Sequence, residues 1–237
     1  MESVFVLIAA LAPVVLLLSY TYRKDKFQRE PVKELLKAFG AGGLSVLLSL
    51  MISIPIAGDS VNEIYSVPDA LSMAFLGAAI PEELAKFLMF WLVVRRNRYF
   101  DEHMDGIVYA VYVSLGFAAV ENVMYLFTSY DSWVSVGVSR ALFAVPGHFA
   151  FGVLMGYYYS LVRFSPVPSL KNTILVLAAP MLVHGLYDSI LFVIGVTPFA
   201  SVVLMILFLI LCRRMWKYGN KKIVEHLERD RMNFNEE

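Results

Sequence analysis

Residues 79–87 read Ala79-Ile80-Pro81-Glu82-Glu83-Leu84-Ala85-Lys86-Phe87, and they lie inside an apolar run over residues 70–94. A run of this length is enough to cross a bilayer as an α-helix, which needs about 20 apolar residues. A charged side chain at the bilayer centre costs about 2.5–3.5 kcal/mol on the insertion scale, so three of them facing lipid would cost on the order of 8–10 kcal/mol. We therefore expect Glu82, Glu83 and Lys86 to point into a protein interior where other polar groups meet them.

The composition of the chain is that of a membrane protein rather than a soluble one. Of its 237 residues, 59% are hydrophobic and 17% are charged, and the mean hydropathy is +0.65. A single cysteine, Cys212, excludes an internal disulfide framework and a cysteine metal cluster. The sequence contains no evident internal repeat or low-complexity segment. It predicts one membrane domain over residues 1–237 that ends in a short cytoplasmic tail at 217–237.

Seven apolar segments predict an all-α, polytopic fold with about seven transmembrane helices. The predicted helices cover residues 4–22, 39–57, 70–94, 107–127, 134–162, 173–194 and 199–216. All but two of the 20 Lys and Arg residues fall in the first, third and fifth connections, at the end of the seventh helix or in the tail. Because basic residues collect on the cytoplasmic side, we expect a multi-pass protein of the cell membrane whose amino terminus is outside and whose carboxyl tail is in the cytoplasm.

With this topology, the position of a residue within its predicted helix indicates how deep it lies in the membrane. Glu82 and Glu83 fall near the middle of the third predicted helix, His148 near the middle of the fifth and His184 near the middle of the sixth. A second set of polar residues falls slightly nearer the outside on the fourth to sixth helices: Glu121, Asn122, Arg140 and Asp188. The sequence thus predicts a polar site in the bundle formed by helices three to six.

Two readings of these residues compete. An intramembrane ion-pair network that only fixes helix packing explains Lys86 and Arg140 as well as a functional site does. Two histidines on different helices at the depth of two glutamates favour a site instead, since one salt bridge does not need two carboxylates. A proton-coupled transporter or a non-catalytic scaffold or receptor could use the same buried network, although transporters usually show internal repeats.

The residue types in the site suit the activation of water. No serine is convincingly placed as a nucleophile, and no Gly-rich phosphate loop is present. A desolvated glutamate can take a proton from water while an imidazole shares it. Alternatively, Zn²⁺ held by Glu82 or Glu83 together with His148 and His184 could acidify the water. Either route leads to hydrolysis, and the choice between a metal and none stays open.

Two stretches on the cytoplasmic side have simple interpretations. His103 stands beside Asp101, Glu102 and Asp105, and a solvated polar turn is a better explanation than a metal site. The tail segment 221–232 alternates apolar and charged residues, which is typical of a surface helix. We therefore expect His226 on this helix to be exposed to solvent.

The spacing of the polar residues resembles that of a known family. The segments Glu82-Glu83-Leu84-Ala85-Lys86, Phe117-Ala118-Ala119-Val120-Glu121-Asn122, His148 and His184-Gly185-Leu186-Tyr187-Asp188 together resemble the PrsW family of intramembrane proteases. That family is similar to the CAAX prenyl proteases, which share a Glu-Glu motif. Where those enzymes carry His in a Phe-x-x-x-His motif, this chain carries Glu121, and we expect His148 to supply the missing imidazole.

The resemblance implies a function and partners. It implies hydrolysis of a peptide bond of a single-pass membrane protein within the bilayer, as the first, extracytoplasmic-side cut of an anti-sigma factor, with no role for nucleic acid. In the mechanism we expect, Glu82 or Glu83 is the general base and His148 shares the activation of water. His184, with Asn122 or Asp188, stabilises the tetrahedral oxyanion.

The topology is tested with reporter fusions placed after Ile64, Tyr130 and Asn235. Because basic residues alternate by connection, we expect external signals at the first two positions and a cytoplasmic signal at the third. A cytoplasmic signal at Ile64 or Tyr130, or an external one at Asn235, would overturn the depth argument.

Overall fold

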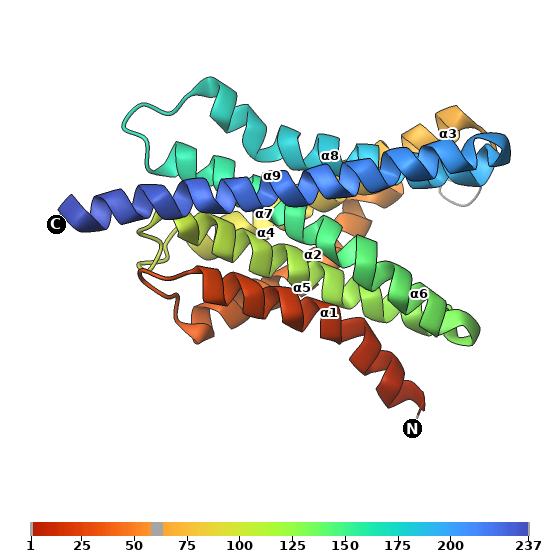
Figure 1. The fold of residues 1–237 in the computed structure, drawn as a ribbon, viewed down its shortest axis with the longest axis horizontal. Coiled ribbons are helices and arrows are strands. Elements are labelled where there is room, and N and C mark those ends of the chain that lie inside the picture. The colour runs from red at the N-terminus through yellow and green to blue at the C-terminus, as the bar shows by residue number, and fades with distance from the viewer. Residues whose placement is uncertain (1, 58–63, 237) are drawn as a thin grey trace.

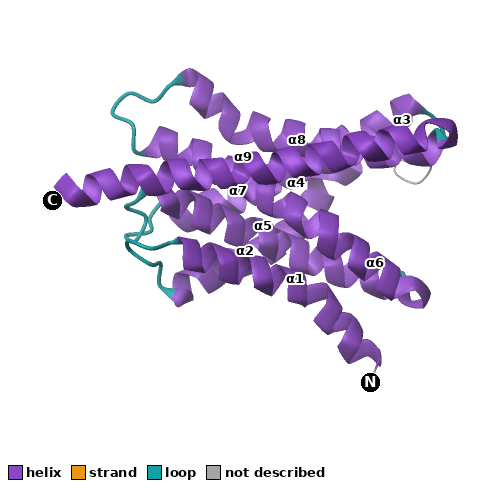
Figure 2. Ribbon diagram, viewed as in Figure 1, coloured by secondary structure: helices purple, strands orange, loops and turns teal. Residues whose placement is uncertain are grey.

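The computed structural model describes residues 2–57 and 64–236, and over these residues it consists of helices without strands (Figures 1 and 2). In the described residues the helices are joined end to end into long rods. Four rods are single helices: α1 (Glu2–Lys24), α2 (Val32–Ala57), α5 (His103–Thr128) and α8 (Leu170–Val196). The third rod is composite: α3 (Val67–Ser72), η2 (Met73–Ala79) and α4 (Ile80–Val94). The fifth and seventh rods are also composite. The fifth consists of η3 (Tyr130–Ser132), α6 (Trp133–Ser139), η4 (Arg140–Ala144) and α7 (Val145–Arg163). The seventh consists of η5 (Pro198–Ala200) and α9 (Ser201–Glu236).

The predicted all-α polytopic membrane fold is confirmed. Six of the rods in the described part of the chain are long and apolar enough to cross a membrane. The remaining rod, residues 67–94, has the length but carries Glu82, Glu83 and Lys86 along its middle. Its charges must therefore be met by neighbouring helices, as the energetic argument from the sequence requires.

The two ends of the bundle differ in charge. The connections that join α1 to α2, α4 to α5 and α7 to α8 lie at the same end as the carboxyl terminus, and the amino terminus lies at the other (Figure 1). We call the first of these the basic end, because its connections and the adjoining part of α9 hold nearly all of the Lys and Arg residues. The helices fan apart toward the opposite end, where α6 diverges from α8 and α9 (Figure 1).

Helix α5 is the central element, and it is buried along most of its length. It packs against α1, α2 and α7, and the contact with α7 is made possible by small residues. A Cβ added to Gly156 would lie 2.1 Å from the backbone oxygen of Gly106, so the two backbones touch. Such small residues replace the hydrophobic effect as the means of helix association in lipid. This close contact brings the polar residues of α5 and α7 together.

Two of the helices that carry the polar site contain π-helical turns directly before a proline. The Ile80 N–H bonds to the Phe75 oxygen, and the Val145 N–H bonds to the Arg140 oxygen, each five residues back. Pro81 and Pro146 follow, and they have no N–H to donate. The wider turn accommodates the proline and resets the direction of the side chains that come next, and π-turns of this kind are frequent at functional sites. Pro180 lies in a regular part of α8.

Two predictions for the basic end are wrong. Glu102, Asp105 and His226 are 9%, 0% and 0% exposed, so neither the turn nor the tail histidine is solvated. The cause is that α9 continues without a break and lays its last turns on the start of α5. Asp230 accepts hydrogen bonds from the backbone N–H groups of His103 and Met104, at 2.8 Å each, and thereby caps α5.

A cluster of buried carboxyl groups therefore lies at the basic end. Its members come from the α1–α2 connection, the start of α5 and the tail: Asp25, Glu30, Glu102, Asp105 and Asp230. Tyr109 donates a hydrogen bond to Glu30, but one oxygen each of Asp25, Glu102 and Asp105 has no hydrogen-bond partner. Burial raises the pKa of Asp25 to about 6 and the pKa values of Glu30 and Glu102 to about 7.

These shifts predict that stability falls as pH rises. Between the ordinary carboxyl pKa near 4 and about 7, the folded protein holds protons that the unfolded chain releases. The extra stability is complete below this window and is lost as pH passes through it. Thermal unfolding of the purified protein measured at pH 5 and at pH 8 checks this.

Glu30→Gln should flatten the pH dependence, because the amide mimics the protonated acid. Glu34→Gln is the matched control, since Glu34 only pairs with the exposed Lys37 at 2.7 Å. A pH dependence that is the same in Glu30→Gln as in the wild type would contradict the assignment.

Candidate active site

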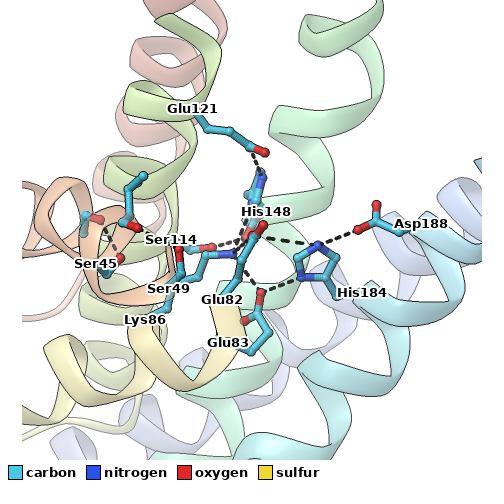
Figure 3. A network of polar contacts seen from close by, with 12 residues as sticks. Ser45, Ser49, Glu82, Glu83, Lys86, Ser114, Glu121, His148, His184 and Asp188 are labelled. Atoms are coloured by element: carbon cyan, nitrogen blue, oxygen red, sulfur yellow. Dashed lines mark hydrogen bonds and ion pairs between the residues drawn. The ribbon is translucent and has the colours of Figure 1, made fainter. Parts of the chain in front are cut away.

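The polar residues singled out in the sequence meet in one network at the middle of the bundle (Figure 3). It draws side chains from four of the rods. Glu82, Glu83 and Lys86 come from α4, Glu121 and Asn122 from α5, Arg140 from η4, His148 from α7, and His184 and Asp188 from α8. All of the expected site residues are therefore brought together by side-chain contacts.

The ammonium group of Lys86 is the hub of the network. Its Nζ lies 3.1 Å from Glu82 Oε2, 2.9 Å from Glu83 Oε1 and 3.2 Å from Nδ1 of His148. It also lies 4.0 Å from the centroid of the Phe117 ring, a cation–π contact. An ammonium has three N–H donors and no acceptor, so each donor has one partner. The spacing of four residues between Glu82 and Lys86 favours their contact, and the folded bundle adds Glu83 and His148.

The contact with Lys86 fixes the tautomer of His148. Because the ammonium can only donate, Nδ1 of His148 accepts and carries no proton. The other nitrogen, Nε2, lies 2.9 Å from Glu121 Oε2 and therefore carries the N–H that donates to this carboxylate. Ser114 holds the same stretch of α7, since its hydroxyl donates to the His148 backbone oxygen at 2.6 Å. His148 is thus a neutral, oriented imidazole.

His184 has the opposite protonation. Its Nδ1 lies 2.9 Å from Glu83 Oε1 and its Nε2 lies 3.2 Å from Asp188 Oδ2. Both partners are carboxylates, which accept, so both nitrogens donate and the ring is an imidazolium. The ring stacks on Phe151 with centroids 4.5 Å apart and planes at 15°. Nε2 also lies 3.9 Å from Glu82 Oε2, which places positive charge beside that carboxylate.

Arg140 and Asn122 tie the network to the first helix. Arg140 Nη2 lies 2.7 Å from Glu121 Oε2, and Arg140 Nε donates to Asn122 Oδ1 at 2.6 Å. The amide nitrogen of Asn122 donates to the backbone oxygen of Ala10 in α1 at 2.9 Å. Both ends of the Asn122 amide are therefore engaged, and this residue positions Arg140 and α1.

The network has a buried side and a more open side. The side chains of Glu83, Lys86, His184 and His148 are 0%, 1%, 5% and 6% exposed. The side chains of Arg140, Glu82, Asp188 and Glu121 are 12%, 16%, 17% and 20% exposed. Of these four, Glu121 and Asp188 lie farther along α5 and α8 from the basic end than the Lys86 hub, so the open side faces away from that end.

The charges of the network do not balance. Four carboxylates face three cations: Glu82, Glu83, Glu121 and Asp188 against Lys86, Arg140 and the His184 imidazolium. A net charge in a buried site is costly, and such sites recover neutrality by taking up a proton or a cation. One further positive charge makes this set neutral. The arrangement is thus suited to accepting a proton or binding a metal ion.

Part of the network also satisfies the geometry of a metal site. One ligand atom each from Glu82, Glu83 and His184 lies within 4.8 Å of the others. Two carboxylates and an imidazole are donors that zinc accepts, so these residues fit the ion. His148 lies outside this group and against Lys86. Of the residues that the sequence offers to Zn²⁺, Glu82, Glu83 and His184 form this group, and His148 is not part of it.

Sequence reasoning missed the residues that support the histidines. Phe151 stands three residues after His148 on α7, so the helical spacing signals that it can share a face with it. Ser114 lies two turns before Glu121 on α5 and is 2% exposed, but a serine in an apolar helix gives no distinctive signal. Ser45 and Ser49 of α2 are also buried beside the network and donate to carbonyl groups of their own helix (Figure 3).

The chain is similar to a group of known membrane proteins. The model of a family described as PrsW family intramembrane metalloprotease matches residues 30–212. Protease PrsW of Oceanobacillus iheyensis is 34% identical over 224 residues, which cover 92% of this chain and 98% of the relative. Protease PrsW of Bacillus subtilis is 38% identical over 184 residues, or 77% and 81% of the two chains. No solved structure matches the chain.

The role of Lys86 as a hub predicts a large loss of stability for Lys86→Met. The substitution leaves Glu82 and Glu83 without their shared cation, which should cost about 3–5 kcal/mol as for other broken buried pairs. Lys37→Met is the control, since Lys37 pairs with Glu34 at 2.7 Å but is 55% exposed. It should cost about 0–1 kcal/mol.

Membrane abundance and thermal unfolding in detergent measure both variants. Adding Glu83→Gln to Lys86→Met should restore part of the loss, because it removes one of the unpaired charges. Equal stability of the two single variants would show that the buried ammonium does not hold the helices together.

Proposed function

This chain belongs to the PrsW family of intramembrane proteases, and we propose that it hydrolyses a peptide bond of a single-pass membrane protein near the extracytoplasmic end of that protein's span. The observation that carries the proposal is the buried network in which Glu82, Glu83 and His184 converge beside a neutral, oriented His148. A network needed only for packing has no reason to hold one carboxylate more than its cations neutralise.

In the proposed mechanism Glu82 is the general base. It is more accessible than Glu83, whose side chain is fully buried between Lys86 and His184. The network holds one more carboxylate than it has cations. When Glu82 takes a proton from the attacking water, this excess negative charge disappears, so proton uptake lowers the electrostatic cost of the site. Both ring nitrogens of His148 are engaged, so its part in the activation of water is to orient Lys86 and Glu121 around Glu82 rather than to take the proton itself.

His184 stabilises the negative charge that develops on the substrate carbonyl oxygen. The imidazolium is held by Asp188 and Glu83 and lies near Glu82, so its charge is oriented before the reaction begins. Asp188 and Asn122 were alternatives for this role in the sequence analysis. We assign both to positioning, because Asp188 is itself negatively charged and Asn122, whose amide is already engaged, carries no charge, whereas His184 acts through its positive charge.

The residues that could bind a metal ion are among those already given roles in this mechanism. Glu82, Glu83 and His184 would hold a zinc ion, which would polarise the substrate carbonyl and acidify the bound water. Lys86 contacts both glutamates, so its ammonium competes with an ion for the same oxygens. Metal analysis of the purified protein, with chelator inhibition of cleavage, distinguishes hydrolysis with a metal from hydrolysis by Glu and His alone.

The proposed side of cleavage rests on the open side of the network. Glu82, Glu121 and Asp188 are its accessible carboxylates, and Glu121 and Asp188 lie toward the end away from the basic connections. The distribution of Lys and Arg supports an orientation in which that end faces the outside of the cell. Peptide bonds in a helix are protected by their own hydrogen bonds, so cutting is easiest near the end of a span. By family resemblance, we propose a membrane-spanning anti-sigma factor as the substrate.

Mass spectrometry of the substrate fragments tests this proposal. A candidate single-pass anti-sigma factor, tagged at both ends, is co-expressed with the wild type and with His148→Ala at matched membrane abundance. We expect a cut within about two helical turns of the extracytoplasmic boundary in the wild type only. A cut on the cytoplasmic side, or equal cutting by His148→Ala, would contradict the assignment.

A further inference from the structure

A groove of about 590 Å³ lies between α7, α8 and α9, away from the catalytic network. Its walls are almost wholly apolar, and they include Ala150, Leu154, Leu182, Val183, Leu211 and Met215. The volume is that of a site for a small ligand, and its lining suits hydrocarbon. Leu182 is 55% exposed, so the groove is open at the surface of the bundle.

The groove runs through one half of the membrane thickness. Leu154 stands nine residues before the end of α7 and Leu182 stands twelve after the start of α8. At 1.5 Å per residue, these positions lie about 14–18 Å from the basic end. Half of the hydrocarbon core measures about 15 Å. The lining on α7 runs from Ala150 to Tyr158, about 12 Å at 1.5 Å per residue, so the groove can hold part of one acyl chain in the leaflet nearer the basic end.

Positive charge lines the groove on the side formed by α9. Arg214, Lys217 and Lys221 line it, and their spacing of three and four residues places them on one face of α9. In the part of the chain that the structure describes, Arg214 and Lys217 have no carboxylate partner, and Lys221 lies 4.0 Å from Glu225 with 71% of its side chain exposed. Three cations that have few carboxylate partners thus line an apolar groove.

We propose that this groove binds an anionic phospholipid, with the phosphate on Arg214 and Lys217 and one acyl chain between α7, α8 and α9. Basic pockets between helices on the cytoplasmic side are suited to such head groups. A zwitterionic lipid would bring a second, cationic group that needs a carboxylate. The nearest acid, Glu225, already accepts hydrogen bonds from Tyr157 at 2.6 Å and Lys222 at 2.9 Å. The charge pattern therefore selects an anionic head group.

The bound lipid would contact the two helices that carry the site histidines. Ala150 follows His148 by two residues, and Val183 directly precedes His184. An acyl chain packed between α7 and α8 therefore supports the spacing of the two imidazoles, whose centroids are 5.8 Å apart. This consequence rests on the proposed function, whereas the binding of lipid does not.

Native mass spectrometry tests the binding. The full-length protein is extracted from vesicles of phosphatidylcholine alone or of phosphatidylcholine with phosphatidylglycerol. We expect retained phosphatidylglycerol in the wild type, with no displacement by added inorganic phosphate. Arg214→Gln with Lys217→Gln should weaken retention by about tenfold or more, equivalent to about 1.4 kcal/mol.

Two further variants separate the groove from general attraction of acidic lipids. Arg229→Gln with Arg231→Gln removes the same charge from the same helix outside the groove and should retain lipid like the wild type. Ala179→Phe fills the groove with the charges intact and should lose the lipid. Equal retention of phosphatidylcholine, equal loss in the α9 control, or no effect of Ala179→Phe would each overturn the proposal.

An activity arm then tests the consequence for the site. If cleavage occurs, phosphatidylglycerol should raise the rate for the wild type and not for the Arg214→Gln, Lys217→Gln variant. A lack of cleavage under all conditions would count against the proposed function and leave the binding result to decide the lipid site. Lipid retention without any effect on the rate would overturn only the supporting role assigned to the acyl chain.

Discussion

Buried charge in a membrane must be neutralised by the protein itself, and Lys86 is the group that does this here. One ammonium contacts Glu82, Glu83 and His148 and lies over Phe117. Without it, two carboxylates of the same helix turn would repel each other in a region that water does not screen. The other helices are arranged around this requirement. Glu121 reaches the hub through His148, and Asp188 reaches it through His184 and Glu83.

The backbone is adapted to bring these groups to one level. Close packing at Gly106 and Gly156 lets α5 and α7 approach without intervening side chains. The π-helical turns before Pro81 and Pro146 set the direction of α4 and α7 just before their functional side chains begin. Lys86 and its partners are thus held firmly, whereas Glu82 at the edge of the network is more accessible. A hydrolase needs both features, because its catalytic groups must be oriented in advance and must still reach substrate and water.

The sequence was sufficient to predict the helical membrane fold and the residues that meet in the site. The cost of burying Glu82, Glu83 and Lys86 required polar partners, and the positions of His148 and His184 at the same depth supplied them. His184 and Asp188 are four residues apart, a spacing that puts them on one face of a helix, and their side chains lie 3.2 Å apart. These inferences succeed because lipid penalises an unpaired charge more strongly than most tertiary effects can offset.

Other features depended on long-range packing that no local pattern records. Nothing in residues 221–232 indicates that α9 continues unbroken and buries His226 against Tyr157, with ring centroids 4.4 Å apart. The engagement of the Asn122 amide by Arg140 and Ala10 joins three helices and cannot be read from spacing within one. The π-turns have no sequence signal of their own beyond Pro81 and Pro146, which cannot donate a backbone hydrogen bond.

We propose that the network performs chemistry and that Glu82, at its accessible edge, is the base. The direct measurement compares Glu82→Gln with Glu83→Gln in purified, reconstituted protein, recording substrate cleavage and thermal unfolding on the same samples. We expect Glu82→Gln to lose cleavage while unfolding close to the wild-type temperature. Glu83→Gln, which loses charge from the fully buried contact with Lys86 and His184, should lower both. Cleavage by Glu82→Gln at the wild-type rate would show that Glu82 is not the base.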